Sequence, residues 1–122
     1  MPDEYLDLAE ALKSMTQEET PGESVTLPVA EKEWYTRPDT VSYGVVSLDF
    51  EADQMYADDR KMIRSWEGSF DLFSMVKSGA GWVEKIVETL EAHCGGCWSL
   101  NSHVYERETG LFHWEWTFEV SD

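Results

Sequence analysis

The clearest pattern in the chain is an alternation of apolar and polar residues close to the C-terminus. Within residues 111–120, the apolar positions are Phe112, Trp114, Trp116, Phe118 and Val120, and the polar positions between them are His113, Glu115, Thr117 and Glu119. Such alternation is typical of a strand with one buried and one solvent-exposed face. A preceding strand is predicted over 97–107, because Glu108, Thr109 and Gly110 suit a short hairpin turn.

Two other stretches have the three- and four-residue spacing of a helical face. In residues 3–16 the apolar positions are Tyr5, Leu6, Ala9, Leu12 and Met15. In residues 81–93 they are Trp82, Val83, Ile86, Val87 and Leu90. The spacing predicts an amphipathic helix in each stretch. The glycines at 95 and 96 are typical of the residues that follow a helix C-terminus.

The middle of the chain predicts two further strands. Residues 40–50 are rich in β-branched and aromatic side chains. Residues 61–75 alternate, and the apolar residues of one parity are Met62, Trp66, Phe70 and Leu72. Residues 25–35 alternate only in part, and Pro28 restricts them to an edge strand or a loop. The polar residues 17–23 indicate a loop.

These elements predict an α+β fold, a mostly antiparallel sheet of about four to five strands with two main helices packed on one face. The length of 122 residues fits a single domain over 1–122. Residues 1–20 form its predicted N-terminal helix and loop, and residues 40–120 form its predicted sheet–helix–hairpin core. The N-terminal helix is not needed to complete that core, so it is a candidate assembly contact.

The charge of the chain argues against two classes of partner. There are 9 Lys and Arg against 25 Asp and Glu, which gives a formal net charge of −16. Nucleic-acid phosphates are gripped by Lys and Arg, so no direct nucleic-acid grip is expected. The same shortage disfavours an anionic membrane surface, and no apolar run approaches the ~18–20 residues that cross a bilayer. The acidic start, Met1–Glu4, is unlike the basic start of a signal peptide.

Aromatic residues make up 13% of the chain, and six of them are tryptophans. That number exceeds what the predicted core obviously needs. The tryptophans either fill the core or mark a protein interface, where Trp, Tyr and Met are enriched.

The motif Cys94-Gly95-Gly96-Cys97 is the one motif with a catalytic look. A redox Cys-x-x-Cys normally opens a helix, whose N-terminus lowers the thiol pKa, whereas this motif follows a predicted helix. Its position and its two glycines favour a plain turn. In the absence of an export signal, we expect both thiols to be reduced, as in a cytoplasm.

Zinc binding is the alternative for the same motif, with His93, Cys94 and Cys97 as candidate ligands. A structural zinc ion needs four close ligands. His103 and His113 share a predicted hairpin and are further candidates, but both are expected on strand faces opposite the core. A surface histidine is the simpler interpretation of each of the three.

An acidic connector over 51–60 is the other candidate site. An EF-hand loop that began at Asp49 would need glycine at its sixth position and glutamate at its twelfth, where Gln54 and Arg60 stand. A solvated acidic loop is therefore the default interpretation, and a loose Ca²⁺ or Mg²⁺ site is the alternative. The candidate interaction residues in this connector are Asp53, Asp58 and Asp59.

Other sequence motifs of catalysis are missing. The chain has no phosphate-binding P-loop, no dinucleotide fingerprint and no Gly-x-Ser-x-Gly nucleophile elbow. We therefore expect a protein that is not an enzyme and uses no cofactor.

Residues 40–120 resemble a known protein family. The segments that carry the resemblance are Tyr43–Val46, Ala57–Arg60 before a long strand, the helix Trp82–Leu90 and the hairpin Val104–Trp116. They resemble the small head–tail connection proteins of tailed bacteriophages, the tail terminators or minor capsid proteins. In that family an acidic residue, Thr, Gly, an aromatic residue and His join the last two strands, as Glu108–His113 do here with Leu111 inserted.

The resemblance implies a structural virion protein, assembled in the bacterial host cytoplasm, whose six-fold ring caps the tail tube and meets the head connector. Its partners would be other copies of itself, the tail-tube protein and the head-connector proteins. A ring requires a heterologous interface that closes. An acidic lining would repel DNA phosphates and let DNA slide through the ring.

A small acidic protein-binding module is the competing hypothesis. In that case the carboxylates imitate a nucleic acid and occupy a basic partner. Carboxylates spaced regularly along one exposed face would favour the module, and a ring with an acidic lumen would favour the phage protein.

Overall fold

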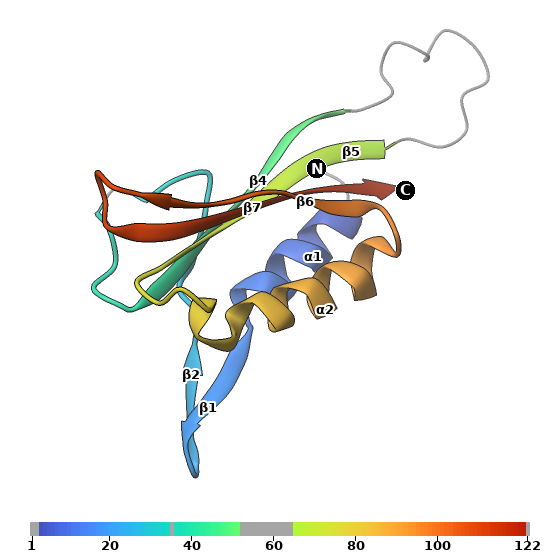
Figure 1. Ribbon diagram of the computed structural model, residues 1–122. Helices are drawn as coiled ribbons and strands as arrows, with labels where there is room; N and C mark the ends of the chain where they lie inside the picture. Colours follow the sequence, from blue (N-terminus) through green and yellow to red (C-terminus); the bar gives the residue numbers. More distant parts are fainter. Residues whose placement is uncertain (1–2, 35, 52–64, 122) are drawn as a thin grey trace, which may run out of the picture.

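The chain folds into a five-stranded sheet covered on one face by two helices, with a separate two-stranded hairpin (Figure 1). The computed structural model describes residues 3–34, 36–51 and 65–121. Its elements are, in chain order, α1 (Asp3–Lys13), β1 (Thr16–Thr20), β2 (Glu23–Thr26), β3 (Val29–Glu31), β4 (Ser42–Glu51), β5 (Ser65–Ser74), the 3-10 helix η2 (Gly79–Gly81), α2 (Trp82–Cys94), β6 (Trp98–Glu106) and β7 (Leu111–Ser121). The predicted α+β class and the placement of the two main helices are confirmed.

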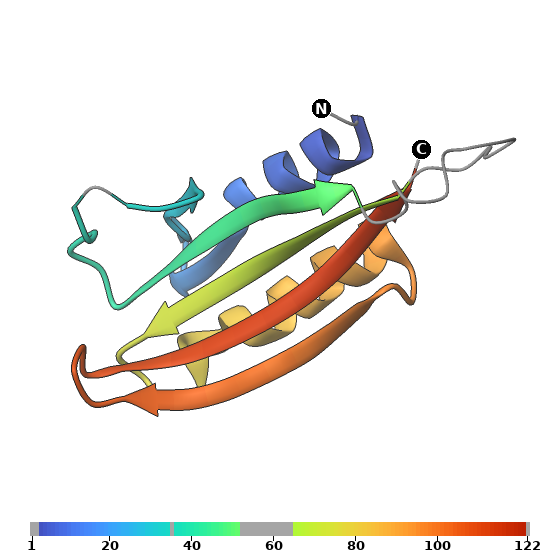
Figure 2. The same ribbon diagram turned by 90° about the horizontal axis from the view of Figure 1, so that it is seen from above.

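The large sheet has the strand order β3-β4-β5-β7-β6. The short strand β3 pairs in parallel with β4, and every other neighbouring pair is antiparallel. Figure 2 shows the four long strands side by side, with α1 and α2 on the same side of the sheet. We call the face that the helices cover the inner face, and the opposite one the outer face.

The core lies between the inner face and the two helices. The largest fully buried side chains include Tyr5 and Leu8 from α1, Ile86 and Leu90 from α2, and Phe70, Trp116 and Phe118 from the sheet. Trp82 and Trp114 are also buried there, and Trp66 and Trp98 pack against the cluster while partly exposed. Five tryptophans therefore belong to the core, whereas Trp34 lies outside it.

The N-terminal helix was predicted to be an assembly contact on the premise that the core is complete without it. That premise is wrong, because α1 is part of the core. Tyr5, Leu8 and Leu12 are each at most 1% exposed. The buried face of α1 is also rotated from the predicted one, since Leu6 is 47% exposed. Removing α1 would uncover the inner face rather than free an appendage.

The predicted loop over 17–23 is also wrong, because these residues belong to the hairpin of β1 and β2. Gly22 closes its turn with a φ of +86°. Nearly all the hairpin residues are exposed on both sides, so the strands carry no apolar alternation that the sequence pattern could reveal. In Figure 1 the hairpin projects away from the body of the molecule.

The predicted boundaries of the other elements hold to within a few residues. The strand predicted over 40–50 is β4, the helix over 81–93 is α2, and the hairpin over 97–120 is β6 and β7. The strand predicted over 61–75 is β5 from Ser65, and Met62 lies outside the described residues. No helix in the described residues is both long and apolar enough to span a bilayer.

Candidate functional site

The outer face of the sheet is the candidate functional surface, because neither main helix covers it and most of its side chains are polar, acidic or aromatic. The four long strands β4, β5, β6 and β7 contain no Lys or Arg. The alternation of β7 aims His113, Glu115 and Glu119 at this face, opposite the buried tryptophans. Among the charged groups that these strands bring to the surface there is therefore no Lys or Arg.

Carboxylates lie in cross-strand pairs on this face. In the pairing of β5 with β7, Glu67 stands directly opposite Glu119, and Asp71 opposite Glu115. Like charges directly opposite one another in a sheet are destabilising. At Asp71 the repulsion is offset by the His113 imidazole, 2.7 Å away, whereas folding stability does not account for the pair of Glu67 and Glu119.

A row of hydroxyl groups separates the two acidic pairs. Ser69 pairs with Ser47 on one side and with Thr117 on the other. The Ser47 and Ser69 hydroxyls are 3.1 Å apart, and the Ser99 and Thr117 hydroxyls are 3.3 Å apart. This row adds hydrogen-bonding groups without adding charge.

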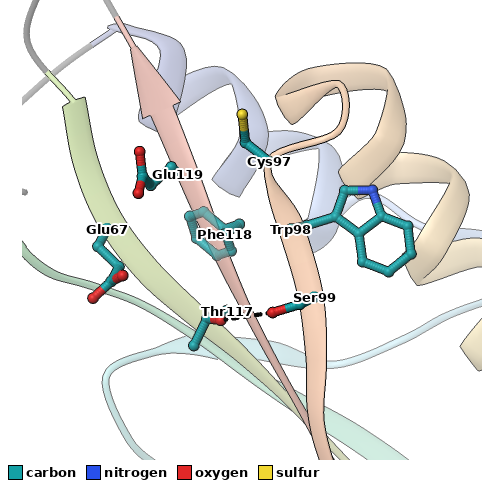
Figure 3. Close-up of a pocket in the computed structure, with 7 residues that line it drawn as sticks. All are labelled: Glu67, Cys97, Trp98, Ser99, Thr117, Phe118 and Glu119. Carbon is teal, nitrogen blue, oxygen red and sulfur yellow. Dashed lines mark hydrogen bonds between the residues drawn. The ribbon is translucent and has the colours of Figure 1, made fainter.

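One of the acidic pairs borders a shallow cleft of about 310 Å³ between the start of β6 and the end of β7 (Figure 3). The residues that line it are Glu67, Cys97, Trp98, Ser99, Thr117, Phe118 and Glu119. Two carboxylates and two hydroxyls in one open cleft offer hydrogen-bond acceptors to a cationic group. In the same view the Trp98 indole lies on the other side of β6, towards α2.

At the opposite end of the outer face, aromatic rings form a row across three strands. Tyr43, Phe73 and His113 are register partners on β4, β5 and β7. The ring centroids of Tyr43 and Phe73 are 5.1 Å apart, and those of Phe73 and His113 are 4.2 Å apart. Burial raises the pKa of the Tyr43 phenol. The row is thus a second, smaller packed cluster, separate from the helix-covered core.

His113 is held between two carboxylates. Its Nε2 lies 2.7 Å from Asp71 Oδ1, and its Nδ1 lies 2.8 Å from Glu106 Oε2. Because ionised carboxylates only accept hydrogen bonds, both contacts are satisfied when the imidazole carries two protons. The hydrogen bond with Asp71 raises the pKa of His113, burial lowers it, and Glu106 raises it, with a net upward shift. The expectation of a plain surface histidine is wrong at this position.

The chain between β3 and β4 folds over the aromatic end. Lys32 adopts the left-handed region with a φ of 75°, and its backbone N–H donates to the Val46 carbonyl at 2.9 Å. The Trp34 indole donates to the Gly44 carbonyl at 3.1 Å, and the Arg37 guanidinium lies 6.0 Å from the centre of the Tyr43 ring. An open cavity of about 410 Å³ remains here. Its lining includes Lys32, Glu33, Arg37 and Asp71, so its charges are balanced.

Cys94 ends α2, and Cys97 lies in the turn that leads to β6. Cys94 is half-buried and Cys97 exposed, and both thiols are free. Burial, with the neighbouring Cys97 and Glu91, raises the pKa of the Cys94 thiol to about 12. At neutral pH this thiol is protonated, which is unfavourable for both nucleophilic attack and metal ligation.

The structure does not bring the candidate zinc ligands together. Within the described residues, no group of three His, Cys, Asp or Glu side chains is arranged to hold a metal ion. His93 is exposed in the last turn of α2. His103 was expected on the face opposite the core, but its ring stacks on Trp114 at 4.3 Å. A β-bulge between Leu100 and Ser102 shifts the alternation of β6 and accounts for the difference.

The interaction residues expected in the acidic connector, Asp53, Asp58 and Asp59, lie outside the described residues. Conversely, the sequence did not single out Asp71, Glu106 or Phe73. These residues come close to His113 only through the register of neighbouring strands, and the periodicity of the sequence does not define that register. The visible signal was that Asp71 and His113 both occupy outward positions of alternating strands.

No protein-family model matches the chain, and comparison with curated protein sequences finds no match. Function is therefore inferred from the residues and their geometry.

Proposed function

We propose that the protein is a structural component of a tailed-bacteriophage virion, a ring at the head–tail junction that resembles a tail terminator and caps the tail tube. The observation that carries the proposal is the uncovered outer face, whose four long strands hold no Lys or Arg. Turned towards a central passage, this face would give the ring an acidic wall. Such a wall repels DNA phosphates and so prevents the passing DNA from sticking.

The hairpin of β1 and β2 supports an assembly role. It forms a sheet of its own, and an isolated two-stranded hairpin is marginally stable in water. A side-chain contact to the body at its base is the Gln17 amide, which donates to the Ala80 carbonyl at 2.6 Å. An arm of this kind is suited to reach a neighbouring subunit, and a heterologous contact between neighbours is what closes a ring.

Native mass spectrometry and negative-stain electron microscopy of the purified chain test the proposal. We expect a species of six times the 14.0 kDa chain mass and ring-shaped particles with a central opening. Incubation with purified tail tubes is the second arm, because a terminator ring can close on the tube end. A chain that is monomeric alone and does not bind tube ends contradicts the proposal.

The acidic protein-binding module remains the second candidate, and the two carboxylate pairs favour it. Glu67–Glu119 and Asp71–Glu115 are four residues apart along β7, which is roughly 13–14 Å in an extended strand. In this case the chain would bind a basic partner as a monomer. Oligolysine binding that is lost in the Glu67→Gln/Glu119→Gln variant, without ring formation, would support the module.

A further inference from the structure

Strand β6 is an open edge of the large sheet. It is last in the strand order, and β7 is its one strand partner among the described residues. Edge strands present unpaired N–H and C=O groups, and proteins usually protect them with Lys, Pro or inward-pointing charges. The sequence of β6, WSLNSHVYE, has no Lys or Pro, and its one acidic residue is the terminal Glu106. A single bulge is the protection that remains.

Apolar side chains of β6 stay exposed although their register partners on β7 are buried, as Trp116 is, or partly buried, as Phe112 is. Leu100 is 49% exposed, whereas its register partner Trp116 is 1% exposed. Tyr105, which pairs with Phe112, is 53% exposed. Both side chains share the inner face with these partners. The apolar layer of the inner face therefore continues past α2 onto β6 and remains uncovered there.

The carboxylates beside this edge lie on the outer face. Glu115 on β7 stands directly opposite Ser102 of β6, and Glu119 lies four residues further along β7 on the same face. An added strand that covers Leu100 and Tyr105 with every second side chain would direct the side chains between them to this acidic face.

We propose that β6 binds an extended segment of a partner protein in which apolar and basic residues alternate. The segment would add a strand to the sheet through its main chain. Its apolar residues would cover Leu100 and Tyr105 on the inner face, and its basic residues, which point to the opposite side of the sheet, would lie near Glu115 and Glu119 on the outer face. The inference goes beyond ring formation, because it concerns a partner of opposite charge rather than another copy of a chain with net charge −16.

The first test uses a synthetic peptide of alternating Val and Lys, about as long as the nine-residue strand, and amide hydrogen exchange of the full-length protein. We expect slower exchange at alternate amides of 98–106, which are those pointing away from β7. A peptide of the same composition with its Val and Lys residues in two blocks is the control for simple charge attraction. The proposal is overturned if β6 gains no protection, or if the block peptide binds equally well.

Two variants locate the surface. Leu100→Lys/Tyr105→Lys puts charges on the edge at exposed positions and should abolish peptide binding. Leu6→Lys, at a position on α1 with a similar 47% exposure, should leave it unchanged. If the wild-type chain instead dimerises through β6, and Leu100→Lys/Tyr105→Lys abolishes the dimer, the occupant is a second copy and the proposal is wrong.

A third variant tests the charge. Glu115→Gln/Glu119→Gln should weaken peptide binding by about three- to tenfold at low salt, the range for two surface ion pairs. Asp7→Asn/Glu10→Gln removes the same charge from exposed positions of α1 and should weaken binding less. Equal losses in both variants would show that net charge, rather than the outer-face carboxylates beside β6, attracts the peptide, and would contradict the proposal.

Discussion

The two faces of the large sheet come from the same strands, yet they differ in the kind of side chain that they carry and in what those side chains contribute to stability. The inner face is packed with apolar side chains such as Phe70 and Trp116, each at most 1% exposed. The outer face places Glu67 directly opposite Glu119, a like-charge contact that costs stability. Burial explains the inner face where the two helices cover it, whereas the outer face needs another reason. Departures from local stability rules are expected at functional surfaces, so the difference directs attention to the outer face.

The largest effect on stability should come from removing a large buried side chain of the inner face. Trp116→Ala removes a fully buried ring, and we expect the free energy of unfolding to fall by about 3–5 kcal/mol. Thr117→Ala, the next residue on the outer face, should change it by no more than about 0.5 kcal/mol. Urea denaturation followed by circular dichroism measures both. Comparable losses in the two variants would show that the faces do not differ as described.

A smaller loss should follow from a methyl group at Gly68, where β4 and β5 approach closely. A Cβ at this position would lie 2.5 Å from the Ser47 carbonyl oxygen and 2.7 Å from the Phe118 ring. We expect Gly68→Ala to destabilise the protein by about 1–3 kcal/mol through overpacking. Gly96→Ala is the control, because its Cβ would meet nothing within 4 Å. A Gly68→Ala variant as stable as wild type would mean that the strands separate easily.

On the outer face, His113 should make stability depend on pH. The pKa of His113 in the folded protein lies above the ordinary value of 6.5, because protonation is favoured by Asp71 and Glu106. Its stabilising contribution is therefore complete below pH 6.5 and is lost as the pH rises through the folded-state pKa. We expect His113→Gln to cost about 1–2 kcal/mol in the acidic range, as for hydrogen bonds to charged groups.

Denaturation curves of wild type and His113→Gln, recorded across that pH range, check this prediction. The stability difference should shrink as the pH rises. Ser99→Ala, which removes an outer-face hydroxyl and no titratable group, serves as the control and should show no comparable narrowing. A difference that grows with pH would reverse the assigned sign.

The smallest effect should have the opposite sign. Glu119→Gln removes one partner of a like-charge pair, and we expect stability to rise by about 0.2–1 kcal/mol. The gain should shrink as salt screens the repulsion. Glu10→Gln on α1 is the matched control for the loss of one charge. Thermal melting at low and high salt measures both variants, and a loss of stability in Glu119→Gln would mean that the pair is not repulsive.

Much of the fold was predictable because buried positions recur along the sequence with the period of a helix or a strand. The alternation of Trp114, Trp116 and Phe118 located β7 and its buried face, and the spacing of Trp82, Ile86 and Leu90 located α2. The hairpin of β1 and β2 was missed because its residues face solvent on both sides and so leave no such record. The face of β6 was missed at His103, because one inserted residue reverses the alternation.

The outer-face site was less predictable, since it depends on contacts between distant residues. Asp71 and His113 are 42 positions apart in the chain, and their contact requires the register of β5 with β7. The position of Trp34 depends on the left-handed Lys32, a conformation that its residue type does not suggest. Composition could reveal that the chain is acidic, but not that the carboxylates pair across strands.

The lack of Lys and Arg in the long strands also determines where trypsin can cleave the chain. Trypsin cuts after these residues, so β5 lies whole between Arg64 and Lys77, β6 between Lys85 and Arg107, and β7 after Arg107. If accessible carboxylates are labelled before digestion, the labelled residues of β5, β6 and β7 will therefore lie on different tryptic peptides. Digestion after labelling would then show, strand by strand, which carboxylates a partner shields.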